Sequence, residues 1–198
     1  MNYRNIISLF FGHFSNYLVP FSMIFLLSRS LDESDFSFFM YSQVVLIWAG
    51  MFIEYGFTLR AIRYLKKDNI DHVTLYNLIQ STKIVLSLVS VFIVLIVLYL
   101  SGLSSFYNYI LVCLIFVFFG LRANWYFIAK EDTSIMTIID LIVSVIFIGT
   151  IFFIENNNLT YVLCLMVVYR FIPTLFHFLL LHHFMILESF HLRMLKMR

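Results

Sequence analysis

The residues of this chain that could do chemistry are ionisable side chains set inside long apolar stretches. Seven stand out in this way: His13, Glu54, Lys83, Arg122, Asp140, Arg170 and His177. A charged side chain in hydrocarbon costs about 2.5–3.5 kcal/mol on insertion scales, so such residues usually face a bundle interior or a watery cavity. Guanidinium, carboxylate and imidazole groups in such a place could bind an anion or carry a coupling ion or a proton.

The chain carries no motif of a known catalytic or metal site. It lacks a GxSxG elbow, an HExxH helix, a phosphate-binding loop and a paired-carboxylate signature. Its two cysteines, Cys113 and Cys164, both lie in apolar runs and belong to no CxxC or Cys/His cluster. We therefore expect a protein that is not an enzyme and that binds no metal, no cofactor and no nucleic acid.

The composition indicates which elements must position these residues. Of the 198 residues, 62% are hydrophobic and 12% are charged, and the mean hydropathy is +0.95. A soluble domain has about 45–50% apolar and about 25% charged residues. These values exclude an ordinary soluble domain, a disordered chain and a secreted disulfide scaffold. They predict an all-α polytopic membrane protein.

Six apolar runs are each long enough to cross a bilayer, since a spanning helix needs roughly 20 mostly apolar residues. The predicted spans are about 6–27, 36–57, 78–100, 107–127, 135–154 and 159–181. We expect these six transmembrane helices to form a single domain over residues 1–198. Residues 182–198 would then form a basic cytoplasmic tail.

The distribution of basic residues predicts that both termini are cytoplasmic. With the N-terminus inside, the cytoplasmic side holds eleven basic residues: Arg4, Arg60, Arg63, Lys66, Lys67, Lys83, Arg122, Lys130, Arg193, Lys196 and Arg198. The outer side then holds Arg29 alone, while Arg170 falls within the sixth span. Because cytoplasmic loops are enriched in Lys and Arg, this asymmetry favours one orientation strongly. An even number of spans returns the C-terminus to the cytoplasm.

Four of the ionisable residues are expected at one level, in the cytoplasmic third of the membrane. Glu54, Lys83, Arg122 and Asp140 each lie three to five residues from the cytoplasmic end of a predicted span, which is roughly 5–8 Å of helical rise. Two interpretations stay open. The four could form structural ion pairs, for example Glu54 with Lys83 and Arg122 with Asp140. Alternatively, they could line a polar vestibule that contacts an anionic headgroup.

Arg170 and the histidines lie at other depths. Arg170 is eleven residues from either end of the sixth predicted span, so its side chain cannot reach the headgroups and needs an interior partner or a wet cavity. His13, in the first span, is expected either to be hydrogen-bonded in the interior or to relay a proton. His177 approaches the cytoplasmic end of the last span and is expected at the membrane interface.

Three segments resemble the signature of a known family. Residues 54–63 (EYGFTLRAIR) resemble the (D/E)-Y-G-F…A-x-R signature of the O-antigen and polysaccharide flippases of the Wzx type. These belong to the multidrug/oligosaccharidyl-lipid/polysaccharide (MOP) exporter superfamily. Pro20, residues 27–31 (LSRSL) and Phe36 are similar to the P…L-x-R-x-L-G…F-G stretch, and residues 125–131 (WYFIAKE) are similar to W-(Y/F)-F-Q-G-x-E. The order of the three segments agrees with the topology given above.

The resemblance implies both a fold and a function. The family has two helical lobes with a cavity between them, and this chain resembles the N-terminal lobe. Members flip oligosaccharides joined by pyrophosphate to a polyprenol, such as O-antigen units, across the bacterial cytoplasmic (inner) membrane. The residues then expected to attract the pyrophosphate are Arg170, Arg122 and Lys83. The candidates for coupling-ion or proton sites are Glu54, Asp140 and His13.

The resemblance leaves alternatives for the activity of this chain. One six-helix lobe cannot enclose the cavity, so the chain is expected either to be a truncated form, to associate with a second six-helix half, or to be an inactive half-length remnant. A multidrug-type exporter of the same superfamily is a further alternative, although a cationic cavity disfavours organic cations. The expected partners are a lipid-linked oligosaccharide, membrane lipids, the second half and other polysaccharide-assembly proteins.

Overall fold

The structure consists of helices joined by short loops. The computed structural model describes the backbone of residues 3–65, 72–130, 133–153 and 158–196, and the side chains of residues 10, 14, 17–64, 73–130, 133–153 and 158–181. The helices are α1 (Tyr3–Leu27), α2 (Glu33–Glu54), α3 (Phe57–Leu65), α4 (His72–Ser101), α5 (Phe106–Leu121), α6 (Asn124–Ala129), α7 (Ser134–Phe152) and α8 (Leu159–Lys196). No strand occurs within these ranges, so the predicted all-α class is confirmed.

The membrane-spanning character of the chain is also confirmed. Over the described residues, five helical stretches are long and apolar enough to cross a bilayer: Glu33–Tyr64, Val73–Ser101, Phe106–Ala129, Ser134–Phe152 and Leu159–Leu181. The apolar part of α1 that is described, Tyr17–Leu27, is shorter, although the helix as a whole has 25 residues. The chain is a polytopic α-helical membrane protein.

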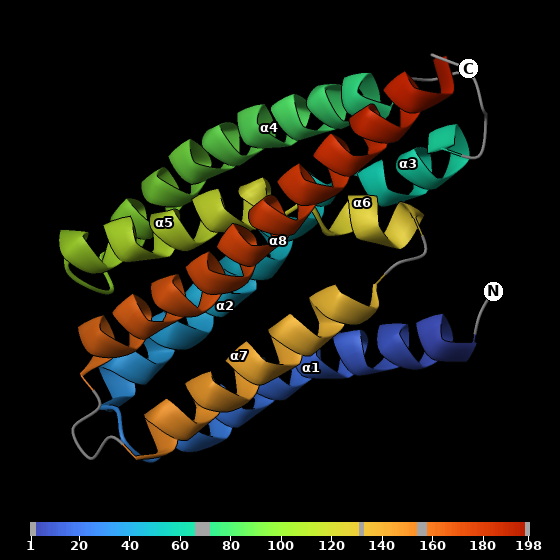
Figure 1. The fold of residues 1–198 in the computed structure, drawn as a ribbon. Helices are drawn as coiled ribbons and strands as arrows, with labels where there is room; N and C mark the ends of the chain where they lie inside the picture. The colour runs from blue at the N-terminus through green and yellow to red at the C-terminus, as the bar shows by residue number, and fades with distance from the viewer. Residues whose placement is uncertain (1–2, 66–71, 131–132, 154–157, 197–198) are drawn as a thin grey trace.

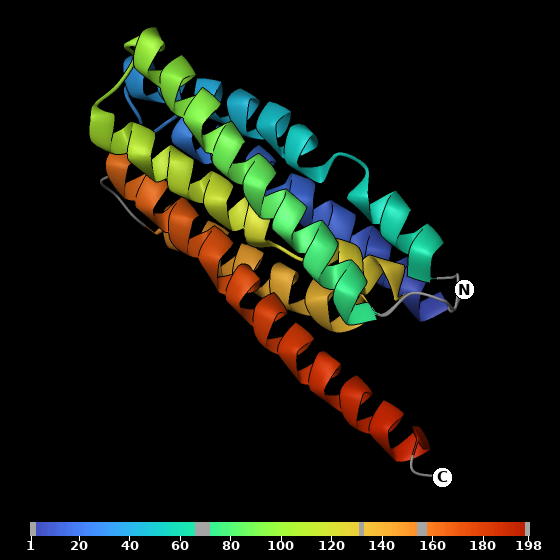
Figure 2. The ribbon, with the colours of Figure 1, turned by 90° about the horizontal axis from the view of Figure 1, so that it is seen from above.

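Two predicted spans are broken near one end. The second span ends at Glu54 rather than Phe57, because Tyr55 and Gly56 have positive φ angles of 29° and 74° and turn the chain into α3. The fourth span ends at Leu121 and resumes as α6. Beyond the last predicted span, α8 continues without a break to Lys196 and extends past the rest of the bundle (Figure 2), while the cytoplasmic location of residues 182–198 stays a prediction.

The helices form a bundle with one tightly packed group and one attached pair (Figure 1). α5 lies between α4 and α8, and α2 packs against α4 and α5, whereas α1 packs mainly against α7. Between helices in lipid, close van der Waals contact replaces the hydrophobic effect as the main attraction, and small residues permit it. Gly120 of α5 shows this, because a Cβ added there would lie 2.3 Å from the Cβ of Ser87 on α4.

A second cluster of buried side chains closes one end of the bundle. Here α3 packs on α6. The cluster includes Phe57, Ala61, Trp125, Tyr126, Met136 and Leu181. Figure 1 shows α3 and α6 at the end where α1 begins and α8 ends. Two chain ends on one side of the bundle agree with an even number of crossings, and the assignment of that side to the cytoplasm remains a prediction from the basic residues.

Candidate functional site

The site is built around the break between α5 and α6. A continuous helix would pair the carbonyls of Gly120, Leu121 and Arg122 with N–H groups four residues later. Here Arg122 is extended, and the chain restarts as a helix only at Asn124. In hydrocarbon an unpaired backbone group costs several kcal/mol, so irregular backbone at this depth needs partners from neighbouring helices.

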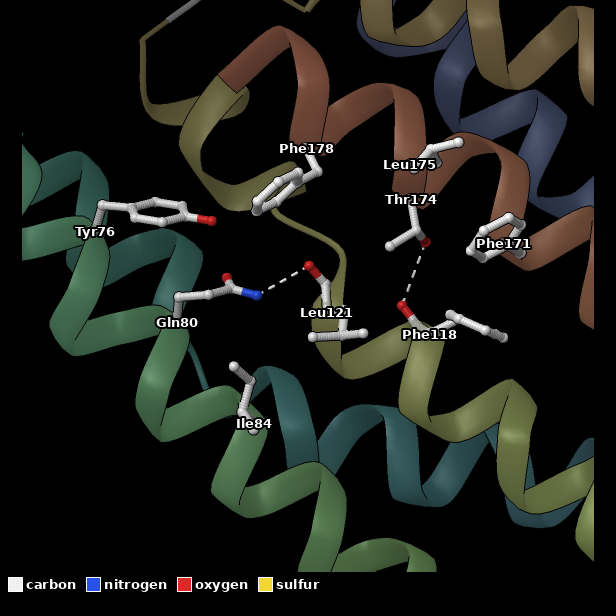
Figure 3. Close-up of a pocket in the computed structure, with 9 residues that line it drawn as sticks. All are labelled: Tyr76, Gln80, Ile84, Phe118, Leu121, Phe171, Thr174, Leu175 and Phe178. Carbon is white, nitrogen blue, oxygen red and sulfur yellow. Dashed lines mark hydrogen bonds between the residues drawn. The ribbon is translucent and has the colours of Figure 1, made fainter. Parts of the chain in front are cut away.

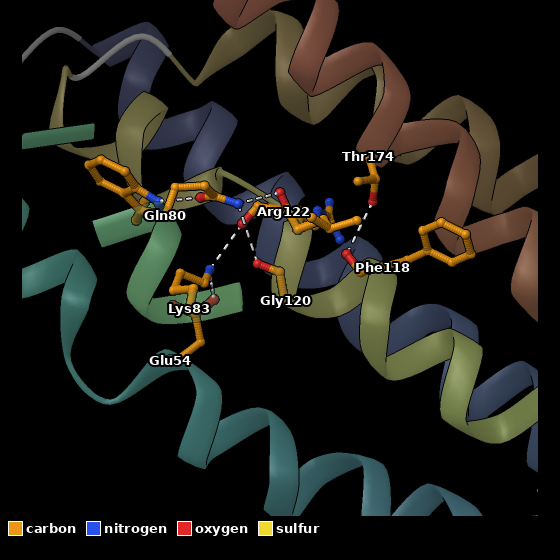
Figure 4. A network of polar contacts seen from close by, with 9 residues as sticks. Glu54, Gln80, Lys83, Phe118, Gly120, Arg122 and Thr174 are labelled. Atoms are coloured by element: carbon orange, nitrogen blue, oxygen red, sulfur yellow. Dashed lines mark hydrogen bonds and ion pairs between the residues drawn. The ribbon is translucent and has the colours of Figure 1, made fainter. Parts of the chain in front are cut away.

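Side chains of α4 supply these partners (Figure 4). The Nε2 of Gln80 donates to the Leu121 carbonyl at 2.9 Å and lies 3.5 Å from the Gly120 carbonyl. One turn further along, the Nζ of Lys83 donates to the Arg122 carbonyl at 2.9 Å. The two side chains replace the N–H donors that the broken helix lacks. They therefore hold the break in place.

Lys83 also forms the first of the two ion pairs that the sequence suggested. Its Nζ lies 2.8 Å from Oε1 of Glu54, the last residue of α2. The side chain of Lys83 is 0% exposed, while that of Glu54 is 37% exposed. Lys83 thus links the α2–α3 turn to the α5–α6 break, and both of its described contacts are within the protein. This predicted pair is confirmed.

The second predicted pair is also confirmed, and it belongs to a larger cluster. Nη2 of Arg122 binds Oδ2 of Asp140 on α7, and both side chains are 11% exposed. On α8, Nε2 of His177 lies 3.6 Å from the other carboxylate oxygen, Oδ1. The expectation that His177 lies at the membrane interface is wrong, since its side chain is 0% exposed and faces this cluster.

Arg170 completes the cluster from α8. It lies one helical turn from Thr174 and two from His177, on the same side of the helix. Its guanidinium carbon is 5.3 Å from the ring centroid of Tyr169 and 6.0 Å from that of Phe119, and it is near enough to Asp140 for a Coulombic interaction. These aromatic faces and the carboxylate explain how a cation is tolerated in the interior.

The cluster has more positive charge and more donors than the described residues satisfy. Arg122 binds the one carboxylate and Arg170 interacts with it electrostatically, so the cluster carries one excess positive charge even with His177 neutral. Among the described side chains, several buried polar atoms of the cluster have no hydrogen-bond partner: Arg122 Nε, Arg170 Nε, Asp140 Oδ1 and both ring nitrogens of His177. A guanidinium N–H without an acceptor can donate a charge-assisted hydrogen bond to an anionic oxygen, so this arrangement suits an anionic ligand.

The structure gathers most, but not all, of the residues singled out from the sequence. Glu54 and Lys83 form one group, and Arg122, Asp140 and Arg170 form the other. Arg122 belongs to both, because its carbonyl accepts from Lys83 while its guanidinium binds Asp140. His13 lies in α1, and its side chain is outside the described residues. No group of three or more potential metal ligands occurs in the part of the chain whose side chains are described.

Two polar residues that the sequence analysis did not include, Gln80 and Thr174, take part, together with Trp125 of the third family-like segment. Gln80 donates to the backbone at the break, and Trp125 Nε1 donates to Oε1 of Gln80 at 3.4 Å. Thr174 Oγ1 lies 3.4 Å from the Phe118 carbonyl and 2.8 Å from the Arg170 carbonyl. Gln80 and Thr174, with Phe118, Leu121 and Phe178, border a cavity of about 290 Å³ between α4, α5 and α8 (Figure 3). The available signal for Gln80 was its position one turn before Lys83 on α4.

Comparisons with known proteins place the chain in a family. The family model described as "Polysaccharide biosynthesis protein" matches residues 3–197. The chain belongs to this polysaccharide biosynthesis family. It is 36% identical over 90 residues to a protein of Escherichia coli (strain K12) named "Putative O-antigen transporter", a match that covers 44% of this chain and 22% of that protein. The chain thus aligns with about a fifth of the length of this relative. No solved structure matches the chain.

Proposed function

We propose that the chain is one lobe of a transporter that flips polyprenyl-pyrophosphate-linked oligosaccharides, such as O-antigen units, across the bacterial cytoplasmic membrane. The observation that carries this proposal is the excess of guanidinium groups with open donors beside a broken helix inside an apolar bundle. Membership in the polysaccharide biosynthesis family and the name of the Escherichia coli relative support the substrate class. The chain would act as a transporter and not as an enzyme.

The proposed role of the cluster is to replace water around the pyrophosphate. Moving a charged, sugar-bearing headgroup through bare hydrocarbon is prohibitively unfavourable. Arg122 and Arg170 would bind the pyrophosphate, and Lys83 would act through the Arg122 backbone that it holds. Asp140 binds Nη2 of Arg122, so the substrate would compete with that carboxylate for the guanidinium. A second lobe would close the cavity and permit alternating access.

Three acidic or basic residues remain proposed coupling sites. Asp140 would release its contact with Arg122 when the substrate binds, and it could then accept a proton or a cation. Glu54 is held by Lys83 but is partly exposed, so it could exchange with solvent. His13 lies on α1, the helix that packs against the α7 that carries Asp140. Other polysaccharide-assembly proteins and membrane lipids are the further proposed partners.

A complementation assay tests this function. A host lacking its own flippase would receive the gene as it stands, together with a second lobe if one is encoded beside it. We expect Arg170→Ala and Arg122→Ala to lower surface polysaccharide at least about tenfold, since each removes a charge-assisted contact of about 1.5–3 kcal/mol. Arg63→Ala, an exposed arginine outside the cluster, is the matched control and should leave the level unchanged.

Two results would contradict the proposal. Wild-type polysaccharide levels in both arginine variants, with normal protein levels, would remove the cluster from the substrate path. Failure of the unmodified chain to restore any polysaccharide, although it is inserted and folded, would favour the inactive remnant. Export of organic cations by the unmodified chain would instead favour a multidrug-type exporter.

A further inference from the structure

A groove between α3 and α4 has features that the proposed transport site does not use. It has a volume of about 230 Å³. From α3 it is bordered by Phe57, Arg60 and Tyr64, which recur at the three- and four-residue spacing of one helical stripe. From α4 it is bordered by Leu75, Leu78 and Ile79. Its floor is apolar and well packed, since Phe57, Leu75 and Ile79 are all buried.

The chemistry of the groove changes along its length. Arg60 is exposed, and no acidic side chain among the described residues pairs with it. Leu78, on the α4 side, is 62% exposed and belongs to an apolar stretch long enough to span the membrane. Tyr64 is 41% exposed beside them. Arg60 therefore gives one part of the groove a positive charge, and Leu78 gives another part an apolar surface. An amphiphile with an anionic headgroup and an apolar chain has the complementary arrangement.

The position of α3 matches the membrane surface. The helix follows the turn at Tyr55 and Gly56, where the apolar span α2 ends, and it packs on α6 at one end of the bundle (Figure 1). Its buried side holds Phe57 and Ala61, whereas its outer side exposes both of its arginines. An amphipathic helix with aromatic residues and exposed basic side chains is typical of the headgroup region.

We propose that this groove binds one phospholipid with a net-negative headgroup. The Arg60 guanidinium binds the lipid phosphate, the Tyr64 hydroxyl donates a second hydrogen bond to it, and a segment of one acyl chain lies along Leu78 on the apolar floor. The charge of Arg60, which no described acidic residue neutralises, is what selects an anionic lipid over a zwitterionic one. This site is independent of the Arg122 cluster and does not rest on the proposed transport function.

The experiment measures lipid binding directly. The full chain is purified in detergent, and bound lipid is counted by native mass spectrometry as phosphatidylglycerol, phosphatidylcholine or polyprenyl phosphate is added. We expect one phosphatidylglycerol to be retained preferentially over phosphatidylcholine. Arg60→Gln should weaken that binding about fivefold, the effect of one basic residue at a membrane surface. Leu78→Trp should displace the acyl chain and abolish preferential retention, although every charge remains.

Arg63→Gln is the matched control, because it removes the same charge from the exposed side of the same helix but does not border the groove. It should change binding less than twofold. Equal losses for the two arginine variants would show unspecific attraction to surface charge and overturn the proposal. Equal retention of the two phospholipids would do so as well. Tighter binding of polyprenyl phosphate than of phosphatidylglycerol would assign the groove to the lipid-linked substrate and also contradict the proposal. Circular dichroism would establish that each variant keeps its helices.

Discussion

The two ion pairs of this protein look alike in sequence but differ in how completely their charges and hydrogen bonds are satisfied. Glu54 and Lys83 balance each other in charge, and Lys83 also donates to a backbone carbonyl. Arg122 and Asp140 share their surroundings with Arg170 and His177, and this group has an excess positive charge and unpaired polar atoms among the described residues. The first pair has the features of a structural ion pair, whereas the second group has the features of an anion-binding site.

The difference shows what distinguishes structure from function inside a membrane. A buried ion pair is weak evidence for stability or for activity by itself, because desolvation offsets much of the attraction. The distinguishing feature is the balance of charges and hydrogen bonds around the pair. A balanced pair needs nothing further, while an unbalanced one is stabilised by a ligand of opposite charge. Substitutions in the two groups should therefore respond differently to an added anion.

The largest effect is expected from Lys83→Met in the balanced pair. This change leaves Glu54 without its partner and the Arg122 carbonyl without its donor. A hydrogen bond to a charged group contributes about 1.5–3 kcal/mol, so the loss of the two bonds that Lys83 donates should cost about 3 kcal/mol or more in the free energy of unfolding. Thermal unfolding in detergent should show a large fall in the unfolding temperature, and added pyrophosphate should not restore it. Arg63→Met is the control, because it removes an exposed cation of α3 and should leave the unfolding temperature nearly unchanged.

The two pairs themselves could be predicted from the sequence, for a simple reason. Glu54, Lys83, Arg122 and Asp140 lie near the same ends of four apolar runs, so an antiparallel arrangement of helices must bring them to one depth. Opposite charges at one depth in hydrocarbon then have few partners other than each other. The all-α polytopic class follows equally directly from the composition.

The break between α5 and α6 could not be predicted in the same way. Residues 107–127 form one apolar run, and nothing local in it forbids a continuous helix. The break is stabilised by Gln80 and Lys83, which come from another helix some forty residues earlier in the chain. His177 was misplaced for a related reason. Its side chain is buried beside Asp140 of α7, a contact between helices that the end of an apolar run does not reveal.

A smaller but more diagnostic effect is expected from Asp140→Asn in the unbalanced cluster. The change leaves two guanidinium groups without a carboxylate, so without added anion the free energy of unfolding should fall by about 2–3 kcal/mol, the upper range for a charged hydrogen bond. Millimolar pyrophosphate should recover part of this loss by binding the folded state, as ligand linkage requires. The measurement is the unfolding temperature with and without the anion. An equal recovery in Lys83→Met would remove the proposed distinction between the two groups.

The smallest effect is expected from Gly120→Ala, which changes the spacing between α4 and α5. Gly120 lies just before the break, and a Cβ there would come within 2.3 Å of Ser87 Cβ and 2.7 Å of its hydroxyl oxygen. Gly120→Ala should therefore force α4 away from α5 and weaken the contacts of Gln80 and Lys83 with the break. Overpacking of this kind costs about 1–3 kcal/mol.

Two further variants separate a steric cause from a general effect of alanine. Ser87→Gly, combined with Gly120→Ala, removes the atoms that the new Cβ would meet and should restore most of the unfolding temperature. Gly149→Ala in α7 adds the same group where no atom lies within 4 Å, and it should leave stability nearly unchanged. If the double variant is as unstable as Gly120→Ala alone, the spacing of α4 and α5 is not what aligns Lys83 with the Arg122 carbonyl. The Glu54–Lys83 pair and the cluster of Arg122, Asp140 and Arg170 would then be independent of each other.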